Sequence, residues 1–174
     1  MTRIRPATIA DAEAIASVHV QAWRETYPGL IPDSILAGLS VEQRVRAWSQ
    51  MLSAGQQAPG VVVAEQGDKI VGFGSARAAR DPLLTTDGEI TAIYLLDDSK
   101  RQGIGRAIFR RLAAWLHERN FASMGLWVLT TNVGARGFYE AMGGRTGPTK
   151  EDVRPDVTLH EVAYIWDRLG QNGP

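Results

Sequence analysis

The sequence contains no cysteine among its 174 residues. Disulfides, thiolate metal sites and a cysteine acyl-enzyme are therefore excluded. An excess of charge of one sign is also lacking, because 19 basic and 19 acidic residues cancel. A neutral chain has no extended electrostatic surface for nucleic acid or for an anionic membrane, so we expect neither as a partner.

Long apolar runs are absent as well. The first residues include Arg5 and Pro6 and are soon followed by Asp11 and Glu13, so no apolar signal core forms, and no run approaches membrane-spanning length. With 44% hydrophobic residues, the chain has the size and composition of one compact domain with a sizeable core. We expect a cytoplasmic protein with a single domain over residues 1–174, and a homodimer is one option for its oligomeric state.

Hydrophobic periodicity predicts strands and helices in alternation. The expected strands are 2–5, 61–65, 70–77, 89–96, 124–129 and 157–166, and the expected helices are 8–25, 40–55, 132–142 and one beginning near 104. Gly67-Asp68 reads as a hairpin turn, and Gln56–Gly60 as another turn. Mostly antiparallel strands with helices on both faces give an α+β fold.

The most informative segment is Glu89–Arg111, an apolar strand followed by a basic glycine turn and a helix. Gly103 and Gly105 lack Cβ atoms, so consecutive N–H groups of the turn can point at one anion. The helix that begins near Ile104 adds its unpaired first-turn donors and the positive end of its dipole. Positive side chains that can bind phosphate are Lys100, Arg101 and Arg106. The segment predicts a pocket for a phosphorylated cofactor.

Two familiar phosphate-binding loops do not fit this turn. A Walker A loop ends in Gly-Lys-Ser/Thr, but Gly105 is followed by Arg106 and Ala107, which leaves no hydroxyl for magnesium. A dinucleotide fingerprint requires glycine or alanine where Ile108 stands. It also requires an acidic residue about twenty positions later, where the chain has Met124-Gly125-Leu126.

Three motifs in a fixed order carry a family resemblance. The turn reads Lys100-Arg101-Gln102-Gly103-Ile104-Gly105, the strand before it reads Glu-Ile-Thr-Ala-Ile-Tyr-Leu over 89–95, and a later helix opens on Asn132 and carries Ala135, Phe138-Tyr139-Glu140 and Gly143. These segments resemble the GNAT superfamily of N-acetyltransferases. Its patterns are Gln/Arg-x-x-Gly-x-Gly/Ala, Glu-Ile-x-x-Ile-Tyr-Val and Ala-x-x-Phe-Tyr-Glu-x-x-Gly. Lys100 and Asp98 depart from the usual residues at their positions.

The resemblance implies the GNAT fold, a mixed and mostly antiparallel central sheet flanked by helices on both faces. It also implies that acetyl-CoA is the co-substrate and that its acetyl group passes directly to a primary amine of a small molecule or a protein N-terminus. The cofactor-binding residues that it implies are Ile93, Tyr94, Leu95, Arg101, Gln102, Gly103, Ile104, Gly105, Arg106, Asn132 and Tyr139. The alternative is a non-catalytic acyl-CoA-binding module on the same fold. The amine, and whether the acyl group is acetyl, stay open.

Acetyl transfer requires a base, because an alkylammonium with a pKa of about 10 has no lone pair. In the family, the position of Glu89 often supplies the base, usually through water; the alternative is a glutamate that faces solvent or pairs with an arginine. Tyr139, with a phenol pKa of about 10, matches the basicity of the leaving thiolate, and the family uses a tyrosine here as general acid. Its alternative role is packing under the sheet.

Several other residues have both a structural and a functional interpretation. Asn132 is expected to cap its helix, to bind the pantetheine arm, or both. His160, on an alternating strand, either reaches the acceptor pocket or is a half-buried structural histidine, and His19 reads as an ordinary helix residue. No cluster of His, Asp or Glu has metal-ligand spacing, so no metal is expected. In the family, the acceptor site usually lies near the position of Trp23, for which core packing is the alternative.

Overall fold

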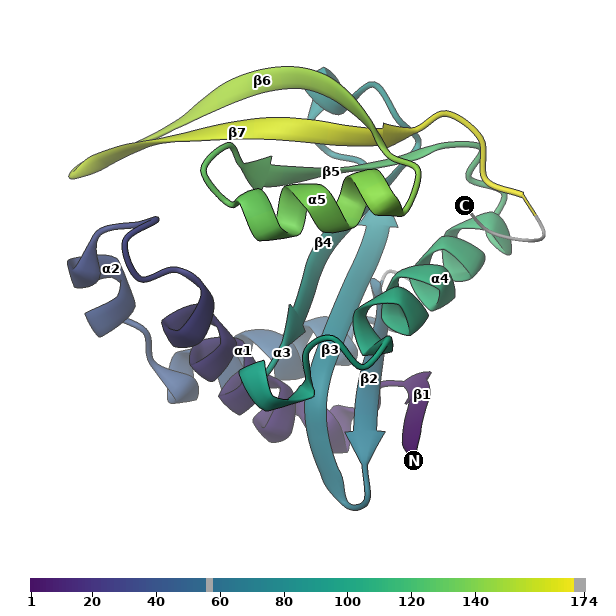
Figure 1. The fold of residues 1–174 in the computed structure, drawn as a ribbon. Helices are drawn as coiled ribbons and strands as arrows, with labels where there is room; N and C mark the ends of the chain where they lie inside the picture. The colour runs from purple at the N-terminus through teal and green to yellow at the C-terminus, as the bar shows by residue number, and fades with distance from the viewer. Residues whose placement is uncertain (56–57, 171–174) are drawn as a thin grey trace. The chain divides into compact units, whose positions relative to one another are not determined.

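The computed structural model describes residues 1–55 and 58–170 (Figure 1). Gln56 and Gln57, at the start of the turn expected over 56–60, lie outside the described residues. The strands are β1 (Thr2–Pro6), β2 (Gly60–Gln66), β3 (Lys69–Ala78), β4 (Gly88–Leu95), β5 (Met124–Leu129), β6 (Arg145–Arg154) and β7 (Val157–Trp166). The α-helices are α1 (Ala12–Thr26), α2 (Asp33–Ala37), α3 (Val41–Leu52), α4 (Ile104–His117) and α5 (Val133–Ala141). Short 3-10 helices are η1 (Ile9–Asp11), η3 (Pro82–Leu84) and η4 (Asp97–Ser99).

The strands follow the order β1-β2-β3-β4-β5-β7-β6 in one sheet. The pairs β1/β2, β2/β3, β5/β7 and β6/β7 are antiparallel. Strands β4 and β5 are parallel, with Gly88 opposite Met124 and Glu89 opposite Gly125. The sheet is therefore mixed and mostly antiparallel, as predicted.

By its internal contacts the chain forms two compact units. Unit 1 comprises Met1–Ala76 and Ala92–Leu112, and unit 2 comprises Arg77–Thr91 and Ala113–Pro174. Along the sequence, the boundaries fall within β3, β4 and α4. The expectation of one domain over the whole chain stays a prediction.

In unit 1, helices cover both faces of β2 and β3. Apolar side chains of α1 and α3 pack on one face, in a cluster that includes Ile15, Trp48 and Phe73. Successive residues of a strand point to opposite faces, so Gly74, next to Phe73, lies on the face opposite to this cluster. A Cβ added to Gly74 would lie 2.6 Å from Cγ2 of Ile108, which belongs to α4. Glycine at this position lets α4 lie close to the strand.

The start of α1 is fixed by a buried ion pair. Arg5 donates to both oxygens of Asp11, at 2.8 and 2.9 Å, and the backbone N–H of Thr8 donates to Asp11 Oδ2 at 2.7 Å. The hydrogen bond from Arg5 and those from Thr8 lower the pKa of Asp11 to about 2, against the opposing effect of burial. The predicted helix from Thr8 therefore begins with the 3-10 turn η1 before it continues as α1.

His19 is buried in an aromatic cluster, which corrects the expectation of an ordinary helix residue. Its Nδ1 accepts a hydrogen bond from Trp48 Nε1 at 3.2 Å, and its ring stacks on Tyr94 with centroids 5.4 Å apart. Burial, with a smaller contribution from Arg44, lowers the pKa of His19 to about 3. The imidazole is therefore a neutral part of the core at physiological pH.

In unit 2, β6 and β7 form a hairpin beside β5. The sequence did not predict β6, because its residues Arg-Thr-Gly-Pro-Thr-Lys-Glu-Asp-Val-Arg lack apolar alternation. The strand lies at the edge of the sheet, and its register shifts between Thr146 and Thr149, where Gly147 and Pro148 lie. An edge strand with an irregular register tolerates a proline and charged side chains.

Candidate functional site

The turn between β4 and α4 has the backbone geometry of an anion-binding loop. Arg101 and Gly103 adopt left-handed conformations with φ of 61° and 79°, and α4 begins directly afterwards at the buried Ile104. Left-handed residues within such a turn direct successive N–H groups into one concavity. A Cβ on Gly103 would meet nothing within 4 Å, so its φ, and not crowding, is what requires glycine.

Polar side chains hold this turn in place. Lys100 Nζ lies 2.5 Å from Asp97 Oδ1 and 3.3 Å from Thr26 Oγ1, so the charge of Lys100 is already paired. The Gln102 amide donates to the carbonyl of Asp98 at 2.8 Å. Arg101 and Arg106 are exposed. Of the three basic residues singled out in the sequence, these two retain charge for a ligand, and Lys100 supports the turn.

The strand before the turn presents its tyrosine to α1. The Tyr94 hydroxyl lies 3.2 Å from the Tyr27 hydroxyl, and the Tyr94 ring packs near Trp23 with centroids 6.2 Å apart. Side chains alternate along a strand, so those of Ile93 and Leu95 point to the opposite face. The Tyr94 side chain is thus part of the core of unit 1.

Glu89, in unit 2, lies at the start of β4 and is half-buried. Glu89 interacts electrostatically with Arg77, whose pKa is lowered by burial and by Arg80 and is raised by Glu89. The Arg77 Nε atom is buried without a hydrogen-bond partner. Glu89 forms no ion pair with any residue in the described ranges. Its carboxylate is therefore not held by an arginine.

Helix α5 opens on Asn132, whose Oδ1 accepts the backbone N–H of Ala135 at 3.1 Å. The predicted capping role of Asn132 is confirmed. Tyr139, near the other end of the helix, is half-buried, and its ring lies 5.9 Å from that of Tyr164 and 6.3 Å from that of Trp166. Both neighbours come from β7, so the tyrosine packs against this strand.

A buried tyrosine on β7 forms hydrogen bonds with two side chains of α5, and one of these side chains forms a third bond to the backbone. The Tyr164 hydroxyl donates to Glu140 Oε1 at 2.6 Å and accepts from Arg136 Nε at 3.2 Å, and Arg136 also donates to the carbonyl of Thr130 at 3.0 Å. Burial and the bond to Glu140 raise the pKa of Tyr164. No motif in the sequence predicted this network, although the i, i+4 spacing of Arg136 and Glu140 does put both on one side of the helix.

His160 does not have the half-buried environment that was expected. Its side chain is 61% exposed, and its Nδ1 lies 3.6 Å from Glu151 Oε1 on the neighbouring strand. Burial alternates along β7 from Val157 to Glu161, with His160 at an exposed position, and every residue from Val162 to Trp166 is buried. The prediction failed because strand periodicity reports the face of a residue, and not whether anything covers that face.

The described part of the chain contains no group of three or more His, Cys, Asp or Glu side chains that could hold a metal ion. In the same ranges, no helix is long and apolar enough to span a membrane. The expectation that the protein uses no metal stays a prediction.

The predicted site residues are divided between the two units. Unit 1 contains Ile93, Tyr94, Leu95 and the turn residues Arg101, Gln102, Gly103, Ile104, Gly105 and Arg106. Unit 2 contains Glu89, Asn132 and Tyr139. Within unit 1 the strand and the turn are consecutive, and within unit 2 Asn132 and Tyr139 occupy opposite ends of α5.

Two comparisons at the level of sequence cover most of the chain. The family described as "Acetyltransferase (GNAT) family" matches residues 19–144. "Uncharacterized N-acetyltransferase YuaI" of Bacillus subtilis (strain 168) is 34% identical over 170 residues, which cover 97% of this chain and 95% of that protein. "Probable N-acetyltransferase Rv2775" of Mycobacterium tuberculosis (strain ATCC 25618 / H37Rv) is 32% identical over 184 residues, which cover 99% of this chain and 95% of that protein.

A solved structure has the same fold. The PaiA N-acetyltransferase from Thermoplasma acidophilum, crystallised in complex with coenzyme A, matches with a TM-score of 0.76 over 95% of this chain and 99% of that chain, at 16% identity. This likeness confirms the predicted α+β fold class, and the sequence matches confirm the family resemblance. The chain belongs to the GNAT family of acetyltransferases and is an acyltransferase.

Proposed function

We propose that the protein transfers the acetyl group of acetyl-CoA directly to a primary amine of a small molecule or of a protein N-terminus. The observation that carries this proposal is the turn after β4, in which left-handed Arg101 and Gly103 lead directly into α4. Such a turn offers converging N–H donors and a helix N-terminus to a pyrophosphate. Names of relatives that are N-acetyltransferases support the same activity.

The residues of unit 1 fit the phosphorylated arm of this co-substrate. The backbone of Gln102, Gly103, Ile104 and Gly105 would hold the pyrophosphate, with Arg101 and Arg106 adding charge. The backbone of the β4 residues Ile93, Tyr94 and Leu95 would bind the pantetheine, helped by Asn132 from α5. Bound acetyl-CoA supplies a thioester, an acyl group already activated for attack by an amine.

Two side chains of unit 2 would handle the protons. Glu89, directly or through water, takes a proton from the ammonium group of the acceptor, and the freed lone pair attacks the thioester carbonyl and forms the new C–N bond. The nitrogen releases its second proton to solvent as the amide forms. As the C–S bond breaks, Tyr139 donates its phenol proton to the leaving thiolate and later recovers one from solvent. The absence of an ion pair at Glu89 and the packed ring of Tyr139 are consistent with these roles.

We also propose that residues 1–174 act as one N-acetyltransferase domain in the cytoplasm. The family match over 19–144 includes parts of both compact units, which supports a single functional domain.

A CoA-release assay over a panel of amines tests the proposal. Acetyl-CoA is supplied with polyamines, amino acids and short peptides, and free thiol is measured against a control without acceptor. We expect at least one amine to accelerate thiol release, with the acetylated product detected by mass spectrometry. Binding of acetyl-CoA without turnover on any amine would instead indicate the non-catalytic acyl-CoA-binding module.

A further inference from the structure

The last turn of α1 is bonded to the segment that leads from β4 into the turn. The backbone N–H of Asp97, the first residue of η4, donates to Glu25 Oε2 at 2.8 Å. Lys100 Nζ, directly after η4, lies 3.3 Å from Thr26 Oγ1 and 2.5 Å from Asp97 Oδ1. All four residues belong to unit 1. The end of α1 therefore contacts the entry to the turn to which we assign the pyrophosphate.

The residue that follows α1 reaches the strand itself. The Tyr27 hydroxyl lies 3.2 Å from the hydroxyl of Tyr94 on β4. The strand residues on either side of Tyr94 have the backbone that we assign to the pantetheine. Residues 25–27 thus contact both parts of the cofactor segment, the strand and the entry to the turn.

The first N–H group of η4 depends on α1 for its partner. The first N–H groups of a helix have no acceptor within it and are usually bonded by the side chain of a capping residue. At η4 the capping position is occupied by Leu96, whose side chain has no acceptor. Glu25 supplies the missing oxygen from another element, so η4 is capped by a tertiary contact.

The carboxylate of Glu25 is oriented by its own helix. Its Oε1 atom accepts a hydrogen bond from Gln21 Nε2, one turn earlier, at 2.8 Å, and its Oε2 atom accepts from Asp97. A hydrogen bond from a backbone N–H to a carboxylate is charge-assisted and is roughly twice as strong as a neutral one. The bond between Glu25 and Asp97 is thus both directed and strong for its type.

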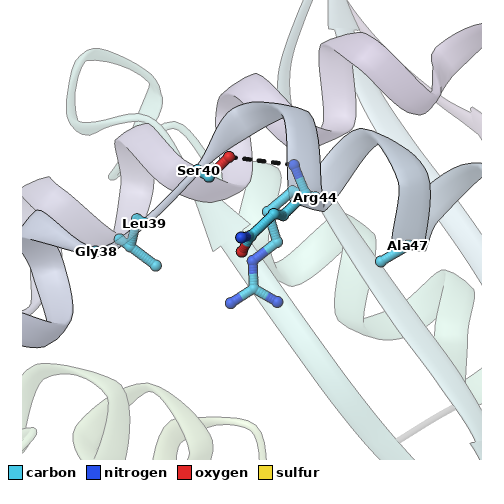
Figure 2. A pocket seen from close by; sticks show the side chains of 6 residues that line it. Gly38, Leu39, Ser40, Arg44 and Ala47 are labelled. Carbon is cyan, nitrogen blue, oxygen red and sulfur yellow. Dashed lines mark hydrogen bonds between the residues drawn. The ribbon is translucent and has the colours of Figure 1, made fainter.

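The last turn of α1 is in turn held by the connection from α2 to α3. Arg24 donates to the carbonyl of Leu39 at 3.2 Å, and the guanidinium carbon of Arg44 lies 5.7 Å from the centroid of the Trp23 ring. Figure 2 shows Leu39 and Arg44, which line the same hollow beside α3. Because this helix end has tertiary contacts of its own, it can serve as a fixed support.

Such a support acts on affinity and not on the chemical step. The left-handed residues give the turn its shape, but a loop that must be ordered when the ligand arrives binds more weakly than one that is already in place. We propose that Glu25 is a positioning residue for acetyl-CoA, which holds η4 through Asp97 and so keeps the entry to the pyrophosphate-binding turn fixed before the co-substrate binds. This inference rests on the proposed function.

Three variants test this role by calorimetric titration with acetyl-CoA. Glu25→Met has a side chain of similar length without an acceptor, whereas Glu25→Gln keeps an oxygen that can accept from Asp97. Glu13→Met removes the same charge from the first turn of the same helix, where the glutamate is exposed. We expect the Kd to rise about 3- to 10-fold in Glu25→Met, the effect of one lost hydrogen bond, and to stay near the wild-type value in the other two variants.

Kinetics and amide exchange distinguish positioning from a merely structural role. In Glu25→Met the KM for acetyl-CoA should rise with kcat unchanged, and amide hydrogen exchange at Asp97 should become faster, whereas Glu25→Gln should restore both. An equal Kd in all four proteins, or an equal loss in Glu13→Met, would overturn the positioning role while thiol release still supports the transferase. Binding of acetyl-CoA that depends on Glu25, without thiol release on any amine, would do the reverse. No binding to the wild type would overturn both.

Discussion

The turn after β4 and the helix α5 are built by different means. In the turn, two left-handed residues set the backbone, and the bond from Gln102 to the Asp98 carbonyl secures it locally. Side chains of the turn also bond to Thr26 and Gln66, which are distant in the sequence. In α5, the position of the helix depends on side chains, because Glu140 and Arg136 both bond to Tyr164, more than twenty residues later in the chain. The conformation of a binding surface made of backbone is set by residues of the turn itself, whereas the orientation of a side chain on α5 is set by a residue of another strand.

This difference separates the effects that substitutions should have. Changes in the turn act on backbone conformation, so they should weaken the binding of acetyl-CoA. Changes at Tyr139 or at its contact Tyr164 act on the chemistry or the orientation of one phenol, so they should slow turnover and leave binding intact.

Tyr139→Phe, a substitution in α5, should have the largest effect on turnover. The ring keeps its packing against Tyr164 and Trp166, but the thiolate loses its proton donor, and a positioned general acid is typically worth about 10² to 10⁴ in rate. Steady-state kinetics with the accepted amine measure kcat, and calorimetric titration measures acetyl-CoA binding. An unchanged kcat would remove Tyr139 from the mechanism.

Glu89→Gln should reduce kcat/KM by about 10² at neutral pH, the lower end of the range for a general base. The deficit should shrink as the pH rises, because the amine then loses its proton to solvent. The measurement is the pH dependence of kcat/KM for wild type and variant, which reports ionisations of the free enzyme and the free substrate. Superimposable profiles would indicate that water or His160 takes the proton, or that the acceptor arrives already neutral.

Tyr164→Phe tests whether the network on β7 orients the phenol. The variant loses the bond to Glu140 and leaves Arg136 Nε without this acceptor, so kcat should fall about tenfold, equivalent to one strong hydrogen bond, while the Kd of acetyl-CoA stays the same. Glu140→Gln retains an oxygen that accepts from Tyr164 and should keep most of kcat. If stability falls in Tyr164→Phe with kcat unchanged, the network is purely structural.

Asp11→Asn should change only the stability of the protein, because Asp11 lies in unit 1 outside the turn. The pKa of Asp11 falls from 3.8 to about 2 on folding, chiefly because Arg5 donates to it, and its side chain is 10% exposed. The shift corresponds to about 2 kcal/mol of stability. This contribution is complete above pH 3.8 and is lost as the pH falls through about 2, so wild type and variant should converge there. Urea unfolding at pH 7 and at pH 2 measures both values, and an equal difference at the two pH values would contradict the assignment.

Much of the fold followed from local patterns in the sequence. The start of a helix at Ser40, the cap at Asn132 and the strand-turn-helix around Gly103 were predicted because their signals lie within a few residues. The strand β6 and the five-residue helix α2 were missed, since the first is an edge strand with Pro148 and the second is too short to show periodicity.

The environment of individual side chains could not be predicted in the same way. His19 has the helical spacing of an ordinary residue, but its burial depends on Tyr94 and Trp48, which come from other elements. Lys100 was expected to serve a phosphate, but it pairs with Asp97. Such contacts depend on tertiary packing, which periodicity and motif spacing do not contain.

The central claim, that the turn after β4 binds acetyl-CoA, is tested most directly by thermal melts of three proteins with and without acetyl-CoA. Gly103→Val and Gly55→Val both force valine into a left-handed backbone where a Cβ meets no neighbour within 4 Å, so both should lose about 1 to 2 kcal/mol as apo proteins. At a hundred times its Kd, acetyl-CoA should add about 2.7 kcal/mol to the wild type and to Gly55→Val, and nothing to Gly103→Val. No shift in the wild type at saturation, or an equal shift in Gly103→Val, would contradict the account.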